Sequence, residues 1–431
     1  MKLPWQIVEP LDARVFAEVR LATIFDCCKW DPQVEDVCTL SPLPLVLTKE
    51  AWRELVSLAE KLAQETVAAE LAILQKPHLL KQLGLSWRLR RRLSDPEVAS
   101  RHARHTRLIR FDFHFTTEGW RISEANTDVP GGFNEASGFT KLIARHYGRT
   151  TTPGDPVEKM TEAISDAAGK SAAIGLVHAT SFADDRQVMV FLGRRLQAAG
   201  HKTLLMAPDH LFWENGRAYA VFNSAKERVD FLVRFFPAEW LPSLPRRCGW
   251  WNLLGGAETP LCNPAAAIIS QSKRFPLVWD ELSGRLPTWE AMLPKTFSLR
   301  DATAQGLGPE SLVFKPAFGR VGDMIKIHGV TSDKEAGKID HAIRRHPKMW
   351  IAQQRFEAVP MSTPSGDVYP CIGVYTLNSK VIGAYGRVAQ RPLIDHRAQD
   401  AAVLIAEDVF SPLSKQPPQD ETIRTLQTVG A

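Results

Sequence analysis

The sequence lacks the features by which secreted, membrane-bound and zinc-binding proteins are most often identified. Its six cysteines form no CxxC pair, which predicts reduced structural thiols rather than a zinc site or a disulfide scaffold. No stretch approaches the roughly 20 consecutive apolar residues that cross a bilayer. The opening residues, "MKLPWQIVEPLD", contain no apolar core of a signal peptide. We therefore expect a soluble, cytoplasmic protein.

Sequence motifs of several enzyme classes are absent as well. There is no GxxxxGK[ST] phosphate-binding loop and no GxGxxG dinucleotide-binding motif. The nucleophile elbow of hydrolases, the HExxH zinc motif and the protein-kinase catalytic loop are also missing. These absences exclude the commonest nucleotide-binding and hydrolytic families, so an active site has to be sought in local patterns.

Length and composition predict an ordinary globular protein with two or three packed units, since 44% of the 431 residues are hydrophobic and 23% are charged. Lysine and arginine number 53 against 48 acidic residues, an excess that suits anionic small molecules but is too weak to predict nucleic-acid binding. Residues 88–110 nevertheless contain a cluster of arginines beside Trp87. An RNA-binding stripe is one interpretation; the lack of interleaved aromatic residues favours a solvated helix face.

Residues 110–126, "RFDFHFTTEGWRISEAN", predict a β-hairpin with a polar face. Three phenylalanines alternate with polar residues, so one face of the first strand is apolar and the other carries Arg110, Asp112 and His114. The Thr-Glu-Gly sequence at 117–119 predicts a three-residue loop whose glycine takes the left-handed conformation. That loop fixes the register of the two strands. The resulting pairs are Thr116 with Trp120, His114 with Ile122, Asp112 with Glu124, and Arg110 with Asn126.

This register places two carboxylates, Asp112 and Glu124, directly opposite each other. Such side chains have Cβ atoms roughly 4.5–5.5 Å apart, and like charges at that distance require a cation. Arg110 is close, but one arginine cannot easily neutralise two acids. Oxygen ligands from Asp112, Glu124 and Asn126 suit Mg²⁺, which also binds water and phosphate oxygens, so a nucleotide is the natural partner. The alternative is a surface hairpin with an Arg–Asp salt bridge.

Two further patterns lie on either side of the hairpin. Residues 48–76 are amphipathic with helical spacing and begin at Thr48, which predicts a long packing helix with a threonine cap. From residue 172 a strand, a helix and a second strand follow one another, which predicts a βαβ unit. Its loop at 180–185 and the segment 234–239 form a candidate substrate surface. An ordinary α/β domain with exposed charges is the alternative.

The section from residue 261 to 410 contains a pattern that suits phosphate binding. "ISQSKRFPLVWDEL" predicts a helix, and "SLVFKPAFGRVGDMIKIHG" predicts two strands joined by a glycine turn. Lys315 ends the first strand and the loop 319–322 follows, so backbone N–H groups would lie beside an ammonium group. Ordinary turn chemistry is the alternative. "MWIAQQRFEAVPM" and "DVYPCIGVYTLNSKVIGAYGRVAQR" predict a strand and an antiparallel pair.

Several of these segments, taken in order, resemble the synthetase domain of glutathionylspermidine synthases and their relatives in the ATP-grasp superfamily. The segments are "RFDFHFTTEGWRISEAN", "FPAEWL", "SKRFPLVW", "VFKPAFGRVGDMI", "WIAQQRFE" and "YPCIGVYTLNSKVIGAYGR". The resemblance covers roughly residues 50–400 and implies an α/β (α+β) ATP-grasp fold with permuted motif order, in which the metal-binding hairpin precedes the phosphate-binding lysines. It also implies a reaction that joins a carboxylate to an amine through an acyl phosphate.

On this basis we expect four parts in the chain. Residues 1–170 hold N-terminal helices and the metal-binding hairpin, and residues 171–260 hold a βαβ pre-ATP-grasp or substrate domain. Residues 261–410 form the ATP-grasp nucleotide-binding region, and residues 411–431 are polar and proline-rich, which predicts a loose tail.

The resemblance further implies roles for individual residues. Asp112, Glu124 and Asn126 match magnesium ligands. Arg110 resembles the arginine that steadies the transferred phosphoryl group, and Arg387 resembles a late arginine that contacts the triphosphate or acyl phosphate. The residues implied in nucleotide binding are Lys273, Lys315, Gly319, Arg320, Gly322 and Gln354. Asp128 and Glu239 are candidates for orienting the incoming amine.

The function expected from these observations is that of an ATP- and Mg²⁺-dependent carboxylate–amine ligase. Its acyl substrate would be a small peptide or an amino acid and its acceptor a polar amine, with no nucleic acid or membrane as partner. The alternative is a non-catalytic nucleotide-binding regulator of the same fold. The intact set of arginine, aspartate, glutamate and asparagine in the hairpin favours the enzyme.

Overall fold

A computed structural model describes residues 2–30, 32–34, 37–319 and 324–407 of the protein. The fold is mixed α/β, as the sequence predicted, and contains several separate sheets. No described helix combines the length and the apolar character that crossing a bilayer demands. The six cysteines are all free thiols. The tail expected at 411–431 lies outside the described residues.

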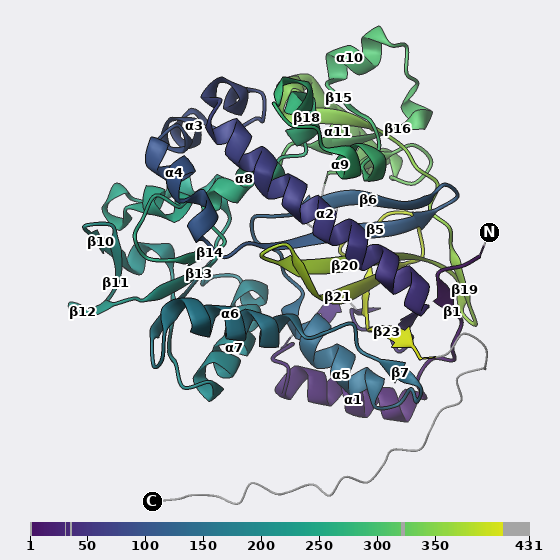
Figure 1. Ribbon diagram of the computed structural model, residues 1–431. Helices are drawn as coiled ribbons and strands as arrows, with labels where there is room; N and C mark the ends of the chain where they lie inside the picture. The colour runs from purple at the N-terminus through teal and green to yellow at the C-terminus, as the bar shows by residue number, and fades with distance from the viewer. Residues whose placement is uncertain (1, 31, 35–36, 320–323, 408–431) are drawn as a thin grey trace, which may run out of the picture.

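A six-stranded sheet lies at the centre of the molecule (Figure 1). Five strands follow one another in the order β22-β21-β20-β5-β6, and β19 pairs with β20. Their bounds are β5 Leu108–Thr116, β6 Gly119–Asn126, β19 Met361–Thr363, β20 Gly366–Leu377, β21 Lys380–Ala389 and β22 Gln399–Ala401. The predicted hairpin and the predicted late antiparallel pair thus belong to one sheet, since β5 pairs antiparallel with β20.

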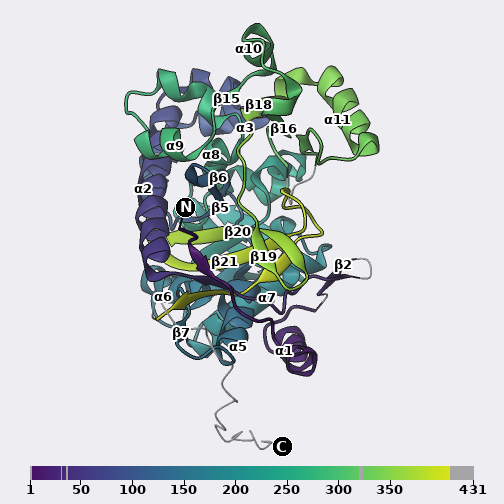
Figure 2. The same ribbon diagram turned by 90° about the vertical axis from the view of Figure 1, so that its right-hand side faces the viewer.

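The long helix α2, Lys49–Leu74, crosses one face of this sheet and packs against β20 and β21 (Figures 1 and 2). Thr48 caps it by accepting a hydrogen bond from the backbone N–H of Ala51, which confirms the predicted start of the helix. The phenylalanines at 111 and 113 are fully buried in the core. The polar side chains of β5 therefore face away from α2.

The hairpin register agrees with the sequence prediction at one end and differs at the other. The predicted pairs of Thr116 with Trp120 and of His114 with Ile122 are wrong, because the loop has two residues rather than three. The observed pairs are Thr116 with Gly119, His114 with Arg121, Asp112 with Glu124, and Arg110 with Asn126. The Thr116 hydroxyl stabilises the shorter turn by accepting from the backbone N–H of Glu118 and donating to the carbonyl of Gly119.

A bulge then restores the predicted pairing at the functional end of the hairpin. The register shifts between Asp112 and Phe113, leaving Ser123 as the extra residue on the second strand. The short turn and the bulge displace the register in opposite directions. Asp112 therefore faces Glu124 as the sequence predicted, although the path between them differs.

The predicted βαβ unit forms a parallel sheet in the order β14-β13-β8-β9, with α6 and α7 packed beside it. These elements are α6 Pro156–Ala168, β8 Ala173–His178, α7 Ala183–Ala198, β9 Lys202–Met206, β13 Phe231–Phe235 and β14 Leu261–Cys262. A three-stranded antiparallel sheet is inserted after β9, with β10 Leu211–Glu214, β11 Arg217–Phe222 and β12 Ala225–Arg228.

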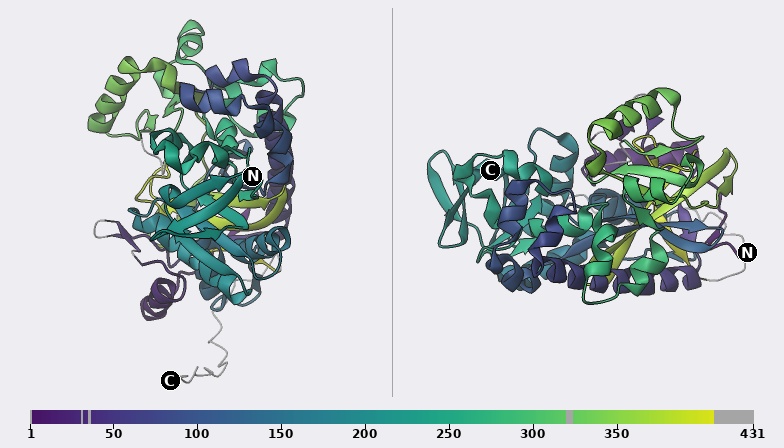
Figure 3. Two further views of the ribbon diagram at one scale, coloured as in Figure 1. Left: turned by 90° about the vertical axis from the view of Figure 1, so that its left-hand side faces the viewer. Right: turned by 90° about the horizontal axis from the view of Figure 1, so that it is seen from above.

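A further antiparallel sheet carries Lys315 and has the order β15-β18-β16-β17. Its strands are β15 Thr296–Phe297, β16 Leu312–Pro316, β17 Lys326–Ile327 and β18 Trp350–Gln354, accompanied by α9 Pro287–Met292, α10 Leu299–Ala304 and α11 Asp333–Arg345. Figure 3 shows this green region and the teal parallel sheet in different parts of the molecule.

The single helix predicted from "ISQSKRFPLVWDEL" is wrong, because the chain breaks there into α8, Ile268–Gln271, and a 3-10 helix, Phe275–Glu281. Ser272 is extended, and its hydroxyl donates to the Leu83 carbonyl and accepts from the N–H of Arg274. Pro276 opens the second helix, and the residue before a proline is disfavoured in a continuing α-helix. The break places Lys273 in a short, largely buried connection between two helices.

The remaining elements join the two ends of the described chain. β4 pairs in parallel with β23 in a sheet of order β1-β4-β23-β7, and β2 pairs with β3. The strands are β1 Trp5–Gln6, β2 Gln33–Val34, β3 Val37–Cys38, β4 Leu45–Leu47, β7 Thr150–Thr151 and β23 Val403–Ala406; the helices are α1 Ala13–Phe25, α3 Trp87–Leu93, α4 Pro96–Arg101 and α5 Thr140–Ala144. Several arginines of the predicted basic cluster lie on α3 and α4. The division of the chain into four parts stays a prediction.

Candidate functional site

A cavity of about 670 Å³ opens over the polar face of the central sheet. Its walls come from three regions: the central sheet, the sheet that carries Lys315, and the loops of the parallel sheet with the segment that precedes β3. Ten predicted site residues line it, namely Arg110, Asp112, Glu124, Asn126, Asp128, Glu239, Lys315, Gly319, Gln354 and Arg387. Segments distant in sequence therefore meet at one site.

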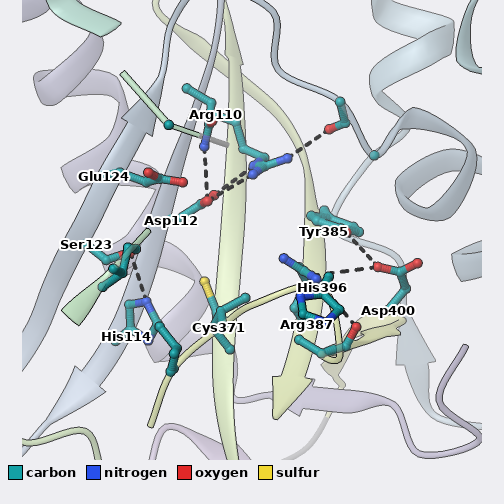
Figure 4. A pocket seen from close by; sticks show the side chains of 18 of the residues that line it. Arg110, Asp112, His114, Ser123, Glu124, Cys371, Tyr385, Arg387, His396 and Asp400 are labelled. Atoms are coloured by element: carbon teal, nitrogen blue, oxygen red, sulfur yellow. Dashed lines mark hydrogen bonds and ion pairs between the residues drawn. The ribbon is translucent and has the colours of Figure 1, made fainter. Parts of the chain in front are cut away.

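Strand alternation positions the floor of this cavity (Figure 4). Arg110 and Asp112 lie two residues apart on β5, so both point to the same face of the sheet. Glu124 and Asn126 lie directly opposite them on β6. Register rather than loop structure thus brings these four polar groups together.

Arg110 and Asp112 form a bidentate ion pair. Arg110 donates from Nε to Asp112 Oδ1 over 2.7 Å and from Nη2 to Oδ2 over 2.9 Å. Asn126 donates to the same Oδ2 over 3.0 Å. A third donor of Arg110 bonds the Gly131 carbonyl over 2.9 Å. Burial opposes the charge of Arg110, but Asp112 outweighs burial and raises the arginine pKa.

The ion pair fits under the neighbouring strand only because residue 373 is glycine. Gly373 lies opposite Asp112 on β20. A Cβ atom at this position would lie 2.7 Å from Arg110 Cδ and 3.0 Å from Asp112 Oδ1. Both separations are too short for unchanged packing, so the glycine makes room for the paired side chains.

Glu124 has its own partner, since its Oε2 lies 3.2 Å from Lys273 Nζ. Burial opposes ionisation of Glu124, but Lys273 and Lys315 outweigh it and lower the pKa of the carboxyl to about 2. Lys315 is buried and donates to the Ser123 carbonyl over 3.0 Å and to Gln353 Oε1 over 2.8 Å. Burial lowers its pKa to about 8, although Glu124 acts in the opposite direction.

The two acids are thus neutralised separately, by Arg110 and by Lys273. This arrangement corrects the interpretation that their proximity by itself requires a metal ion. The donor set still fits Mg²⁺, because two carboxylates and an amide line a cavity and magnesium is often held by one or two carboxylates. Within the described residues, no cluster of three or more His, Cys, Asp or Glu side chains is placed to bind a metal. These oxygen donors differ from the thiolate and thioether ligands that soft metals prefer.

The other predicted nucleotide-binding residues are distributed around the same wall. The Lys273 ammonium donates to the Gly319 carbonyl over 3.4 Å, and Gln354 ends β18 with an exposed side chain. Arg387 lies on β21 and donates to the Asp395 carbonyl over 2.7 Å. Arg320 and Gly322 lie outside the described residues.

The two predicted substrate residues differ in their surroundings. Asp128 is buried and held by Arg234, whose Nη2 lies 2.5 Å from Oδ1, while Oδ2 accepts from the N–H of Ala238 over 2.9 Å. Both of its oxygens are therefore engaged by the protein. Glu239 lines the cavity at the start of a 3-10 helix, Ala238–Ser243.

Several side chains in the cavity were missed by sequence reasoning. Cys371 lies in the floor opposite Arg387, and burial raises the pKa of its thiol. The Tyr385 ring lies 5.2 Å from the Arg110 guanidinium. Both could have been found by extending the strand alternation to β20 and β21. His114, which the sequence placed on the polar face of the hairpin, also lines the cavity, and burial lowers its pKa to about 4, which predicts a neutral imidazole there.

A second group missed from the sequence consists of Lys29, Glu135 and Asp400, all of which line the cavity. Lys29 contacts Glu135 and lies 3.1 Å from Asp400 Oδ2. The three residues come from three distant parts of the chain, so no local pattern connects them.

Comparisons with known proteins agree with this architecture. The family model described as glutathionylspermidine synthase preATP-grasp matches residues 43–405. A glutathione synthetase-like effector from Globodera pallida, solved in the apo form, is similar with a TM-score of 0.62 and 13% identity, covering 92% of this chain and 99% of that one. At this identity the likeness concerns the fold alone.

Weaker similarity extends to two other solved structures. A putative gamma-glutamylcysteine synthetase from Methylobacillus flagellatus has a TM-score of 0.38 and 13% identity, covering 84% of this chain and 88% of that one. A D-alanyl-alanine synthetase A from Vibrio cholerae has a TM-score of 0.32 and 11% identity, covering 56% and 90%. No curated protein sequence matches significantly.

Proposed function

Because the chain belongs to the glutathionylspermidine synthase preATP-grasp family, we propose that it is an ATP- and Mg²⁺-dependent ligase that joins a carboxylate to an amine. The observation that carries the proposal is the pairing of Asp112 and Glu124 with separate cations on the floor of one cavity, close to Lys315. Carboxylates placed among several cations suit the binding of a metal–triphosphate complex. The acyl substrate would be a small peptide or an amino acid, and the acceptor a polar amine.

In this proposal Asp112, Glu124 and Asn126 would hold magnesium. When bound, the ion would neutralise phosphate oxygens and so ease the approach of an anionic carboxylate to the γ-phosphorus. Lys273 and Lys315 would contact the triphosphate, supported by their position on one wall beside Glu124. Gln354 and the loop of Gly319, Arg320 and Gly322 would contact other parts of the nucleotide.

The reaction has two steps. A carboxylate oxygen attacks the γ-phosphorus, ADP leaves, and an acyl phosphate forms. The amine nitrogen then attacks the acyl carbon, the amide forms, and inorganic phosphate leaves with the oxygen that came from the carboxylate. The ammonium group must lose a proton before it attacks, and Glu239 is the proposed orienting group.

Arg110 and Arg387 would stabilise charge during both steps. Arg110 presents several donors from a rigid guanidinium, which suits the oxygens of an acyl phosphate and of the tetrahedral intermediate. Arg387 would assist from β21. Asp128 is bound by Arg234 and by a backbone N–H, so its proposed role is to hold the substrate-facing loop rather than to take a proton.

The order of these parts along the chain is the basis for proposing a permuted ATP-grasp arrangement. The hairpin with the proposed metal ligands comes first, at β5 and β6, whereas Lys273 and Lys315 follow later. All of them meet at Glu124, which lies beside both lysines. Permuted order thus leaves the spatial arrangement of the site intact.

An isotope experiment tests the proposal. Pooled small carboxylates labelled with ¹⁸O are incubated with Mg·ATP and pooled amines, and products and phosphate are analysed by mass spectrometry. We expect ADP, an amide and ¹⁸O-labelled phosphate only when both substrate classes are present, and none of these with Asp112→Ala. Nucleotide binding without any product across the pools would instead support the non-catalytic regulator.

A further inference from the structure

The cavity contains an ammonium group supplied by the protein itself. Lys29 Nζ lies 3.1 Å from Asp400 Oδ2 and also contacts Glu135 Oε1. The Lys29 side chain is only 13% exposed, and both carboxylates are buried still further. Burial opposes the charge of Lys29, but Asp400 and Glu135 outweigh it and raise the lysine pKa. The corner formed by Lys29, Glu135 and Asp400 therefore favours the ammonium form of the lysine.

Backbone contacts fix the segment that carries this lysine. The Cys27 carbonyl accepts from the Asn134 amide over 2.6 Å, and the N–H of Trp30 donates to Gln187 Oε1 over 3.0 Å. Hydrogen bonds to residues 27 and 30 therefore hold the backbone on both sides of Lys29. The segment precedes residues 43–405, which match the family model, so Lys29 lies outside the matched region.

Tyr385 connects this corner to the proposed reaction centre. Its ring lies 5.2 Å from the Arg110 guanidinium, and its hydroxyl donates to Asp400 Oδ1 over 2.6 Å. Figure 4 shows Arg110, Tyr385 and Asp400 in succession along the cavity wall. One tyrosine side chain therefore connects Arg110 to the carboxylate of Asp400.

The carboxylate pair also has unused capacity for a cation. Glu135 Oε2 is buried and has no hydrogen-bond partner among the residues that the structure describes, while the residue is 5% exposed and lines the cavity. An ionised carboxylate accepts on both oxygens, and an ammonium group has three donors. Removal of the Lys29 side chain would take the nearest cation from both acids, leaving Asp400 with Arg387 at 3.9 Å, and would open a space of ammonium size between them.

We propose that Lys29 determines acceptor specificity by occupying a carboxylate pair that would otherwise bind the second ammonium of a diamine. The site so filled favours an acceptor with a single amino group near Arg110. This inference rests on the proposed ligase function, because only that reaction has an acceptor amine. The occupancy of the corner by Lys29 can nevertheless be tested by a binding measurement alone.

The test compares wild-type protein with Lys29→Ala by titration calorimetry, using 1,4-diaminobutane as the probe and 1,4-butanediol as the neutral control. We expect the affinity for the diamine to rise at least about tenfold in the variant, because hydrogen bonds to buried charges are among the strongest. The diol should bind neither protein. Lys141→Ala, which removes a partly exposed lysine paired with Asp155, should leave diamine affinity at the wild-type value.

Two additional measurements keep the result decisive. In Lys29→Ala/Glu135→Gln the gain in diamine affinity should disappear, because one of the two carboxylates is neutral. If Lys29→Ala folds poorly, its melting temperature should rise with the diamine and not with the diol. Equal melting temperatures in the two solutions, or equal diamine affinities of wild type and Lys29→Ala, would overturn the inference.

The outcomes also separate this inference from the proposed function. If Lys29→Ala gains diamine binding but the protein forms no amide, the inference that Lys29 occupies the corner would stand and the proposed ligase function would fall. If the protein is a working ligase but Lys29→Ala gains neither diamine binding nor diamine turnover, only the specificity role of Lys29 would be refuted.

Discussion

Two carboxylate pairs lie on the walls of the same cavity, and each is neutralised in a different way. In the hairpin, Asp112 and Glu124 have separate partners, Arg110 and Lys273. In the far corner, Glu135 and Asp400 share the ammonium of Lys29 as their nearest cation. The first pair is paired with cations that can also face a triphosphate, whereas the second surrounds Lys29 and has Arg387 as a more distant partner, 3.9 Å from Asp400 Oδ1.

The difference shows how the number of cations around buried carboxylates distinguishes a binding site from a structural one. The hairpin acids meet donors from two strands and from a connection between helices, so other ligands can replace individual contacts. The corner acids surround one lysine, which forms ion pairs with these two carboxylates. The first arrangement suits chemistry, and the second suits the exclusion of a competing cation.

The largest effect is expected from neutralising the hairpin acids. Asp112→Asn and Glu124→Gln should each lower ligase turnover by about 10³-fold or more, because phosphoryl transfer depends mostly on charge placement. ADP release in the presence of both substrate classes measures this. Glu118→Gln changes a carboxylate at the exposed hairpin turn and should retain wild-type turnover. Undiminished ligation by either cavity variant would refute the assignment.

The next effect concerns stability in the far corner. Lys29→Met should lower the free energy of unfolding by about 3 kcal/mol, because it takes the nearest cation from two buried carboxylates and leaves Asp400 with only the more distant Arg387. Urea unfolding followed by tryptophan fluorescence measures the change. Lys141→Met removes a more exposed ion pair and should cost less than about 1 kcal/mol. Equal losses in the two variants would mean that the corner is an ordinary surface contact.

A smaller loss is expected when the hairpin pair is displaced without a change in charge. Gly373→Ala adds a Cβ atom 2.7 Å from Arg110 Cδ, so the ion pair must move. A displacement of this kind should lower turnover by about 10- to 100-fold. Gly337→Ala, on α11 with open space around it, is the matched control and should have no effect. Wild-type activity of Gly373→Ala would show that the position of the pair is unimportant.

The smallest effect is a pH dependence of nucleotide affinity. The Lys315 pKa is lowered to about 8, mainly by burial, so the side chain is an ammonium below that pH and neutral above it. The affinity for a magnesium complex of a non-hydrolysable ATP analogue should therefore fall as pH rises through 8, by up to about tenfold per pH unit. Lys315→Arg stays charged and should bind with little change between pH 7 and pH 9. Parallel pH profiles for the two proteins would contradict this.

The sequence predicted the family and the ATP-grasp class of the fold, and both predictions are confirmed. Strand alternation and register also predicted that Asp112 lies opposite Glu124. That success depended on two features that the sequence did not indicate, the two-residue turn and the bulge at Ser123, which displace the register in opposite directions. Local periodicity therefore located the functional end of the hairpin but not the path that leads to it.

The contacts between distant segments could not be predicted in this way. Nothing near Lys29 in the sequence indicates that it meets Glu135 and Asp400, because their contact depends on tertiary packing rather than on strand register. The separate neutralisation of Glu124 by Lys273 was missed for the same reason. Its cause is the break at Ser272, where a side-chain hydrogen bond and a nearby proline end the predicted helix.

Titration calorimetry with a non-hydrolysable ATP analogue, with and without Mg²⁺, tests the central claim most directly. The account predicts that wild-type protein binds the analogue more tightly with Mg²⁺, and that the double variant Asp112→Asn/Glu124→Gln loses this gain while keeping its melting temperature within a few degrees. Equal affinities with and without Mg²⁺ in the wild-type protein, or an unchanged gain in the double variant, would contradict it.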